Sequence, residues 1–366
     1  MRSRTVVAAL CAAALLAGAA NAADKSLLNS LKAGTPDLKQ AGALAFAPEG
    51  ILLVGDTTSA AIFAIDTGDR PAKPADGGIK VEGVNQKIAG MVGADVKQVK
   101  INDLAVNPMS GNAYLSVTRG QGKDAMPVLL RVKQSGDIEE LPLKDVKFAK
   151  AALPNPPDAN RAQQRVDTIT SLAFADGKVY VAGLSNEEFS SKLRAIPFPF
   201  TEADKGTSIE IYHASHNRVE TNSPIRTFVP YKIKDETNLL AAYTCTPLVK
   251  VPVSDLKPGE KVKGTTIAEL GNMNRPLDMI VYQKDGKDYI LMANSARGVM
   301  KVPTEGMGTA KAVTEPVRGG GKAGVPYETI EGLKGVLQLA KLDKGHALIL
   351  VDKGGGALNL ETIDLP

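Results

Sequence analysis

Asn238 to Pro252 (NLLAAYTCTPLVKVP) and Tyr289 to Pro303 (YILMANSARGVMKVP) are two stretches of the chain that align without a gap. Each combines an apolar strand, a small polar turn and a second strand, which is the pattern of a β-hairpin. Looser copies of this pattern begin at Ile51, Ala113 and Ala347, and a fourth begins at Val179. Hairpins repeated every 50 to 70 residues or so are typical of β-propeller blades. The sequence therefore predicts an all-β fold, a six-bladed β-propeller.

Four finer expectations follow from the same alignment. The segment from Gly68 to Gln98 has room for a degenerate blade, which makes seven blades the alternative, and within it Val84 to Val92 is a candidate short helix. In the third hairpin, Val179 to Ser185 is expected to pair with Ile209 to Ser215, across a long insertion at Asn186 to Gly206. Short apolar runs before five of the hairpins are expected to be the innermost strands.

The last blade is expected to stop after its third strand, because only the hairpin from Ala347 to Ile363 follows its inner strand. A propeller closes its ring when one terminus lends the missing strand to the other, which also removes an exposed sheet edge. We predict that this N-terminal strand lies within Ser26 to Gln40.

Residues 1–22 have the pattern of a signal peptide: Arg2 and Arg4, an apolar run from Thr5 to Gly18, and the small residues Ala20-Asn21-Ala22. We expect residues 23–366 to form a single propeller domain that is periplasmic or secreted. No other segment approaches the roughly 20 apolar residues that span a bilayer.

Charge and cysteine content narrow the classes of function. Removing Arg2 and Arg4 takes the formal net charge from +4 to +2, and nucleic-acid binders need a concentrated basic face that this chain lacks. Of the two cysteines, Cys11 lies in the signal sequence. Cys245 is then left without an intramolecular partner, so the sheets must supply the stability.

Composition also separates this chain from several propeller types. It has no Trp, which excludes the Trp-Asp repeats of WD40 blades, and the Gly-Gly pairs of kelch blades do not recur. From about Ala41 to Pro366 the chain resembles exported bacterial propellers of the quinoprotein-like and NHL-like kind. This resemblance implies architecture and carries no functional residues with it.

Propeller topology predicts which loops share a face. The loop into each inner strand and the turn between strands two and three emerge on one face, which we call the Cys245 face. It is expected to gather polar residues around the lone thiol, and we predict that they bind a ligand: Cys245, Arg275, Asn294, Arg297, Asp103 and Asp278. Two arginines beside Asn donors suit a small anionic molecule, and a periplasmic partner protein is the alternative. The other interpretation of Cys245 is a small buried residue that packs beneath its turn.

The three histidines suggest a rival function. His213 and His216 lie three residues apart in a turn, and His346 is a more distant third candidate for a metal ligand. Imidazole suits copper, and a copper-dependent oxidoreductase acting on superoxide or another small oxidant is therefore the alternative. The plainer interpretation is two exposed turn histidines. From the predicted pairing of the third hairpin, all three histidines are expected on the face away from Cys245.

Overall fold

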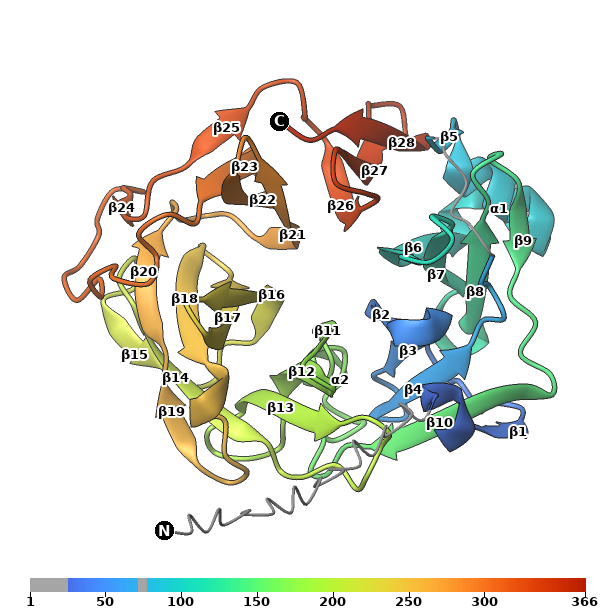
Figure 1. The fold of residues 1–366 in the computed structure, drawn as a ribbon, viewed down its shortest axis with the longest axis horizontal. Helices are drawn as coiled ribbons and strands as arrows, with labels where there is room; N and C mark the ends of the chain where they lie inside the picture. Colours follow the sequence, from blue (N-terminus) through green and yellow to red (C-terminus); the bar gives the residue numbers. More distant parts are fainter. Residues whose placement is uncertain (1–25, 72–77) are drawn as a thin grey trace, which may run out of the picture.

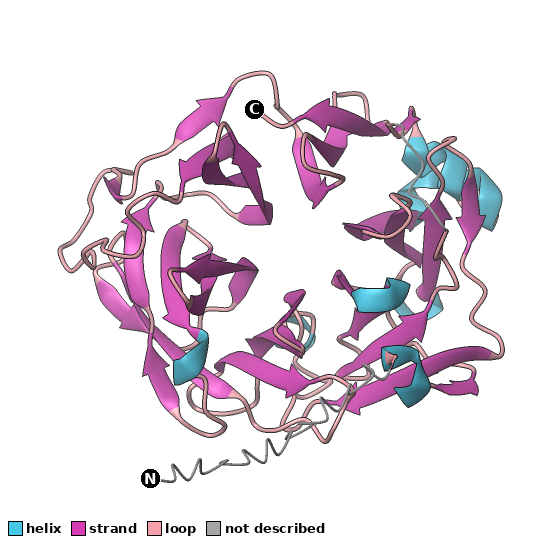
Figure 2. Cartoon of the chain, in the orientation of Figure 1, coloured by secondary structure: helices cyan, strands magenta, loops and turns pink. Residues whose placement is uncertain are grey.

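The computed structural model describes residues 26–71 and 78–366, and these form six β-sheets around a central axis (Figure 1). Strands dominate the ring and the few helices lie at its periphery or in loops (Figure 2). The predicted six-bladed propeller is confirmed. The predicted signal peptide lies outside the described residues.

We number the blades by the chain order of their inner strands. Blade 1 contains β2 (Leu44–Ala47), β3 (Ile51–Asp56), β4 (Ala61–Asp66), β10 (Val146–Ala152) and β1 (Lys32–Gly34). Blade 2 contains β6 (Val99–Val106), β7 (Ala113–Arg119), β8 (Met126–Val132) and β9 (Ile138–Glu140). Blade 3 contains β11 (Ser171–Ala175), β12 (Lys178–Leu184), β13 (Ser191–Pro197), β14 (Thr207–His213) and β15 (Arg218–Glu220), with β19 (Lys261–Lys263) parallel to β14.

The other three blades have the same antiparallel order from the channel outward. Blade 4 contains β16 (Ile225–Ile233), β17 (Glu236–Tyr243), β18 (Pro247–Pro252), β20 (Thr265–Glu269) and β24 (Ala323–Gly324). Blade 5 contains β21 (Pro276–Lys284), β22 (Lys287–Asn294), β23 (Gly298–Pro303) and β25 (Glu328–Ile330). Blade 6 contains β26 (Val336–Lys341), β27 (His346–Asp352), β28 (Leu358–Asp364) and β5 (Lys80–Val81).

Helices are short and lie in the connections. The helix predicted in the first interblade segment is confirmed as α1 (Val84–Val92), and a single turn, α2 (Ala162–Arg165), precedes blade 3. The 3₁₀ turns are η1 (Leu27–Ser30), η2 (Pro48–Gly50), η3 (Val96–Gln98), η4 (Gly122–Asp124) and η5 (Val253–Asp255).

The blades do not follow one another around the ring in simple chain order. Blade 2 lies between blades 1 and 6, and blade 3 lies on the other side of blade 1 (Figure 1). After blade 2 the chain therefore passes back along blade 1, where β10 adds a strand beside β4. Blade 1 is composite, because a later segment of the chain completes it.

Blade 6 is composite as well, and here the expected ring closure is wrong in its details. A strand from the N-terminal part of the chain does complete the last blade, but it is β5, which pairs Val81 with Leu360. The segment that we expected to close the ring instead forms β1, which pairs with β10 at the outer edge of blade 1. The segment considered for a seventh blade thus supplies this closing strand and α1.

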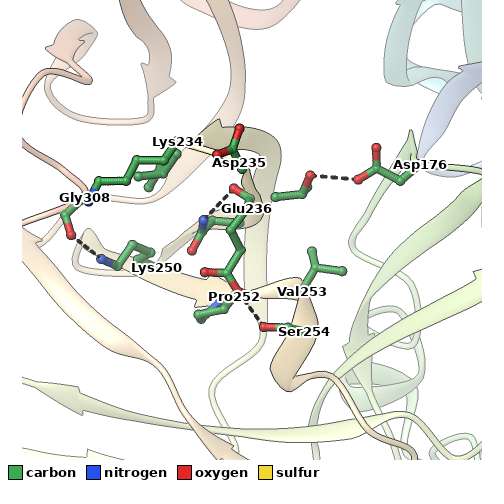
Figure 3. Close-up of a pocket in the computed structure, with 12 residues that line it drawn as sticks. Asp176, Lys234, Asp235, Glu236, Lys250, Pro252, Val253, Ser254 and Gly308 are labelled. Carbon is green, nitrogen blue, oxygen red and sulfur yellow. Dashed lines mark hydrogen bonds between the residues drawn. The ribbon is translucent and has the colours of Figure 1, made fainter.

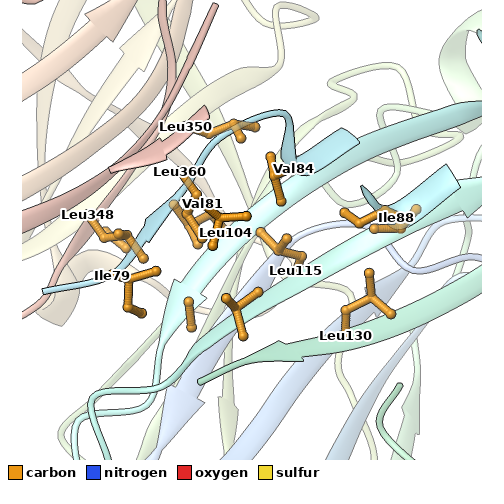
Figure 4. Close-up of a cluster of buried hydrophobic side chains, with 14 of the residues drawn as sticks. Ile79, Val81, Val84, Ile88, Leu104, Leu115, Leu130, Leu348, Leu350 and Leu360 are labelled. Atoms are coloured by element: carbon orange, nitrogen blue, oxygen red, sulfur yellow. The ribbon is translucent and has the colours of Figure 1, made fainter. Parts of the chain in front are cut away.

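The core lies between neighbouring blades, where each strand presents alternate side chains to the next sheet. Figure 4 shows one such cluster, in which Val81 and Ile88 pack with Leu115 of blade 2 and with Leu348 and Leu360 of blade 6. All five side chains are buried. The segment around β5 and α1 therefore fills the seam between the second blade and the last one.

Blade 3 also differs from the prediction, because it has one more strand than expected before β14. The insertion at Asn186 to Gly206 contains β13, which pairs with β12 along its whole length, from Lys178 opposite Pro197 to Leu184 opposite Ser191. The segment expected as the third strand is therefore the fourth, β14. Because successive antiparallel strands run in opposite directions, one extra strand moves the turn after β14 to the opposite face. This places His213 and His216 on the Cys245 face.

The composite last blade leads to a stability prediction. Val81→Asp places a charge in the seam and should lower the free energy of unfolding by about 3 kcal/mol or more. Leu31→Asp is the matched variant, because Leu31 is also buried but leads into the outermost strand of blade 1. Denaturant unfolding with hydrogen exchange should show loss of protection in β26–β28 for the first variant only. Equal loss in both variants would contradict the closing role of β5.

Candidate functional site

Two histidines and Cys245 meet on the Cys245 face. One ligand atom from each of His213, His216 and Cys245 lies within 4.8 Å of the other two. The histidines come from the β14–β15 turn of blade 3, and the cysteine comes from the β17–β18 turn of the adjacent blade. We call these three residues the His-His-Cys cluster. Imidazole nitrogens and thiolates bind metal ions through bonds of about 2.0–2.3 Å.

Glu220 orients both imidazole rings. Its carboxylate oxygens lie 3.0 Å from His213 Nδ1 and 2.7 Å from His216 Nδ1, and Ser223 Oγ and Arg218 Nε donate to it as well. Burial opposes ionisation of Glu220, but these four hydrogen bonds outweigh it and the pKa falls well below its usual value. An ionised carboxylate only accepts hydrogen bonds, so each Nδ1 carries the proton. This leaves the lone pair on each Nε2.

His213 Nε2 has no hydrogen-bond partner among the described residues, although the residue is only 1% exposed. A buried unpartnered nitrogen is costly unless something else occupies its lone pair. The turn that carries it is held in place, because Ala214 N and Ser215 Oγ donate to the buried carboxylate of Glu269. The His213 and His216 rings lie 3.8 Å apart between centroids. His216 is the exposed member, so the cluster is open to solvent on one side.

The cysteine turn has an unusual backbone. Cys245 and the β-branched Thr246 have φ values of 64° and 58°, a left-handed region that such residues rarely adopt. Neighbours on the connection to blade 5 hold this conformation: Cys245 N donates to Asn274 O, and Thr246 Oγ1 donates to Gly271 O. Strain of this kind persists where the surroundings fix it, and it often marks functional sites.

His346 stays on the opposite face, as expected from its position at the start of β27. Its Nδ1 lies 2.9 Å from Asp343 Oδ2, and its Nε2 lies 3.4 Å from Asp364 Oδ1. The hydrogen bond and charge of Asp343 raise the pKa of His346. The structure therefore separates this histidine from the other two.

Asp103 and Asp278 line the central channel at bulges in two inner strands. Each carboxylate links two blades: Asp103 accepts from Leu44 N and Leu104 N, and Asp278 accepts from Leu339 N and Met279 N. Loss of solvation through burial raises the pKa of Asp103 to about 7. Burial first, and then the charge of Asp103, raise the pKa of Asp278 well above its usual value.

Above this pair, a polar pocket of about 180 Å³ opens at the mouth of the channel. Its cationic lining residues are Lys100, Arg226 and Arg275. Arg226 Nη1 pairs with Asp167 Oδ1 at 2.8 Å, and its Nε donates to Thr244 Oγ1, next to Cys245. Partial desolvation and then the nearby charge of Arg226 lower the pKa of Arg275, against the opposing effect of Asp167.

Asn294 and Arg297 do not line this channel pocket. Both line a separate hollow of about 340 Å³ between blades 5 and 6. Asn294 is buried and accepts a hydrogen bond from Asn274 Nδ2, while Arg297 Nη2 donates to Asn272 O. These contacts hold turns together. Arg275 and Arg297 are thus brought into two different pockets, and Cys245 lies with the histidines.

A larger hollow of about 800 Å³ lies at the β16–β17 turn, on the face opposite Cys245 (Figure 3). Its polar groups are largely occupied with one another: Ser254 Oγ donates to Glu236, and Lys250 Nζ donates to Gly308 O. None of the predicted site residues lines it.

No family model matches the chain, and no curated protein matches its sequence. Among solved structures, the PQQ-bound aldose sugar dehydrogenase of Streptomyces coelicolor is 12% identical with a TM-score of 0.35, over 91% of this chain and 96% of that one. Streptogramin B lyase is 8% identical with a TM-score of 0.30, over 92% and 97%.

A third similar structure is the arabinanase Arb43A of Bacillus subtilis, 11% identical with a TM-score of 0.37, over 73% of this chain and 95% of that one. The six sheets around a central axis make the chain a six-bladed β-propeller protein. Likeness at this level transfers no activity. Within residues 26–71 and 78–366, no helix has both the length and the apolar character needed to cross a membrane.

Sequence reasoning missed Arg226 because it did not identify the inner strand of blade 4. The run IRTFVPYKI immediately precedes the best-defined hairpin, and that position was the available signal. The role of Glu220 as the residue that orients both imidazoles became visible only from the register of β15 against β14.

The channel carboxylates predict a pH dependence of stability. Their folded-state pKa values are raised, so the stability associated with the protonated forms is complete below pH 4 or so and declines as pH rises through about 7. Asp278→Asn removes one carboxyl group and, with it, the repulsion between the two carboxylates. It should therefore reduce the decline in melting temperature between pH 5 and 8. The exposed Asp158→Asn is the control. An unchanged decline in Asp278→Asn would show that the pair does not titrate in this range.

Proposed function

We propose that the protein is an exported metalloprotein that binds one copper ion at the His-His-Cys cluster. The supporting observation is the convergence of His213, His216 and Cys245 from two blades, with the Nδ1 atoms of both rings fixed by Glu220. A carboxylate behind a ligating imidazole sets its tautomer and raises its basicity as a metal ligand.

The donor set favours a soft or borderline transition metal. One thiolate and two imidazoles suit copper or zinc and do not suit magnesium or calcium, which prefer oxygen ligands. Three protein ligands also leave a coordination position open, as catalytic sites require. The exposed side of His216 gives a small molecule access to that position.

With copper bound, the proposed activity is one-electron chemistry on a small oxidant such as superoxide. A bound copper ion would supply one-electron chemistry between its two oxidation states. That would suffice to oxidise one superoxide to dioxygen and to reduce a second, with uptake of two protons, to hydrogen peroxide. The chain's own contribution is to hold the two imidazoles and keep one side of the cluster open.

Metal content tests the proposal directly. Untagged mature protein loaded with copper and then desalted should retain about one copper per chain, measured by elemental analysis. The double variant His213→Ala/His216→Ala should lose it, while His346→Ala on the opposite face should keep it. Copper absent from the wild type, or lost equally in His346→Ala, would overturn the assignment.

The orienting role of Glu220 gives a second test. Glu220→Gln keeps the shape of the side chain but presents an amide donor to one imidazole in place of a carboxylate oxygen. It should weaken copper binding by about 10- to 100-fold. Competition titration against a chelator measures this change. Glu305→Gln, on an exposed side chain, is the control. No difference between the two variants would restrict Glu220 to a structural role.

A second candidate function is the binding of a small anionic molecule or a periplasmic partner protein on the Cys245 face. It is favoured by two cations at the channel mouth, because the side chains of Arg275 and Lys100 have no ion-pair partner in the described part of the chain. An accessory or binding protein would need no metal. The two candidates are compatible, since they use neighbouring sites.

A further inference from the structure

We infer that the mouth of the central channel binds a small hydroxycarboxylic acid. Arg226 and Arg275 would hold its carboxylate, and the carboxyl groups of Asp103 and Asp278 would meet its hydroxyls. This inference rests on the second proposed function and names the chemical class of its ligand. It does not depend on a metal.

The balance of charge in the pocket is the first support. Three cations line it, and among the residues that the structure describes only Arg226 has a carboxylate partner, Asp167. The two remaining carboxyl groups lie deeper, and burial raises the pKa of both, to about 7 for Asp103. Arg226 lies close enough to lower the pKa of Arg275, and an anion would stabilise two cations placed side by side in this way.

The carboxyl groups of Asp103 and Asp278, deep in the pocket, distinguish a hydroxy acid from a simple oxyanion. Each of the paired carboxyl groups uses its oxygens to accept two backbone N–H donors. A protonated carboxyl can also donate a hydrogen bond, so the pair can exchange hydrogen bonds with hydroxyl groups. Polar side chains of Asn102, Thr170 and Gln338 line the same pocket.

The space available limits the size of the ligand. The mouth pocket measures about 180 Å³, and a second cavity of about 220 Å³ lies further along the channel. Asp103 and Asp278 line both cavities, so the carboxyl pair sits where they meet. Pockets for drug-sized ligands begin near 300 Å³ or so, which makes a small, polar molecule the appropriate occupant.

The pocket is also tied to the His-His-Cys cluster. Arg226 Nε donates to Thr244 Oγ1 at 3.2 Å, and Thr244 directly precedes Cys245 in the turn. A ligand that moved Arg226 would therefore act on the turn that carries the thiol. This contact gives the two sites a physical connection.

Isothermal titration of metal-free protein with three probes tests the inference: D-gluconate, D-glucose and inorganic phosphate. Gluconate should bind at least 10-fold more tightly than either of the others, because only gluconate offers both a carboxylate and hydroxyls. Arg275→Gln should weaken gluconate binding at least 10-fold without changing the melting temperature. Arg161→Gln, whose side chain is exposed and does not line the pocket, is the matched control.

The outcomes separate the inference from the function on which it rests. Phosphate binding as tight as gluconate binding, with the same loss in Arg275→Gln, would leave an oxyanion site and overturn the hydroxy acid. Glucose binding as tight as gluconate binding would overturn the role of the arginines. Failure of all three probes to bind would overturn both the inference and the small-anion function.

Discussion

Ring closure is the constraint on which the rest of this structure depends. A propeller sheet is stable only when both of its faces are covered by neighbouring blades, so an open ring would expose two apolar faces. Here the seam between blades 2 and 6 is closed by β5 and α1, whose apolar side chains pack with both blades. A second composite blade, completed by β10, ties the start of the chain to its middle. The ring is therefore fastened at two places by segments distant in sequence.

The closed ring also determines where chemistry can occur. Turns from adjacent blades are brought together at fixed positions, and side chains from different hairpins meet there. The His-His-Cys cluster joins blades 3 and 4 in this way, and the channel pocket joins inner strands from around the ring. Carboxylates strengthen both places. Glu220 holds two imidazoles, while Asp103 and Asp278 each join the backbone of one inner strand to that of the next.

Much of the fold followed from local pattern. Alternating apolar residues around small polar turns identified the full hairpin in five blades and its first strand in blade 3, and a short apolar periodicity identified α1. The two-residue strand β5 and the strand β13 were missed, because neither has enough alternation to stand out from its surroundings. The second omission had the larger consequence. One uncounted strand reversed the predicted face of His213 and His216.

The sequence by itself determined the class of fold, the number of blades and the kinds of side chain available for chemistry. These depend on hydrophobic period and turn composition, which are local properties. Only the tertiary structure decided that His213 and His216 lie beside Cys245, that Arg275 and Arg297 face different pockets, and that Lys80–Val81 closes the ring. Each of these depends on strand pairing between distant segments. Pairing is set by the packing of whole sheets, which no short stretch of sequence encodes.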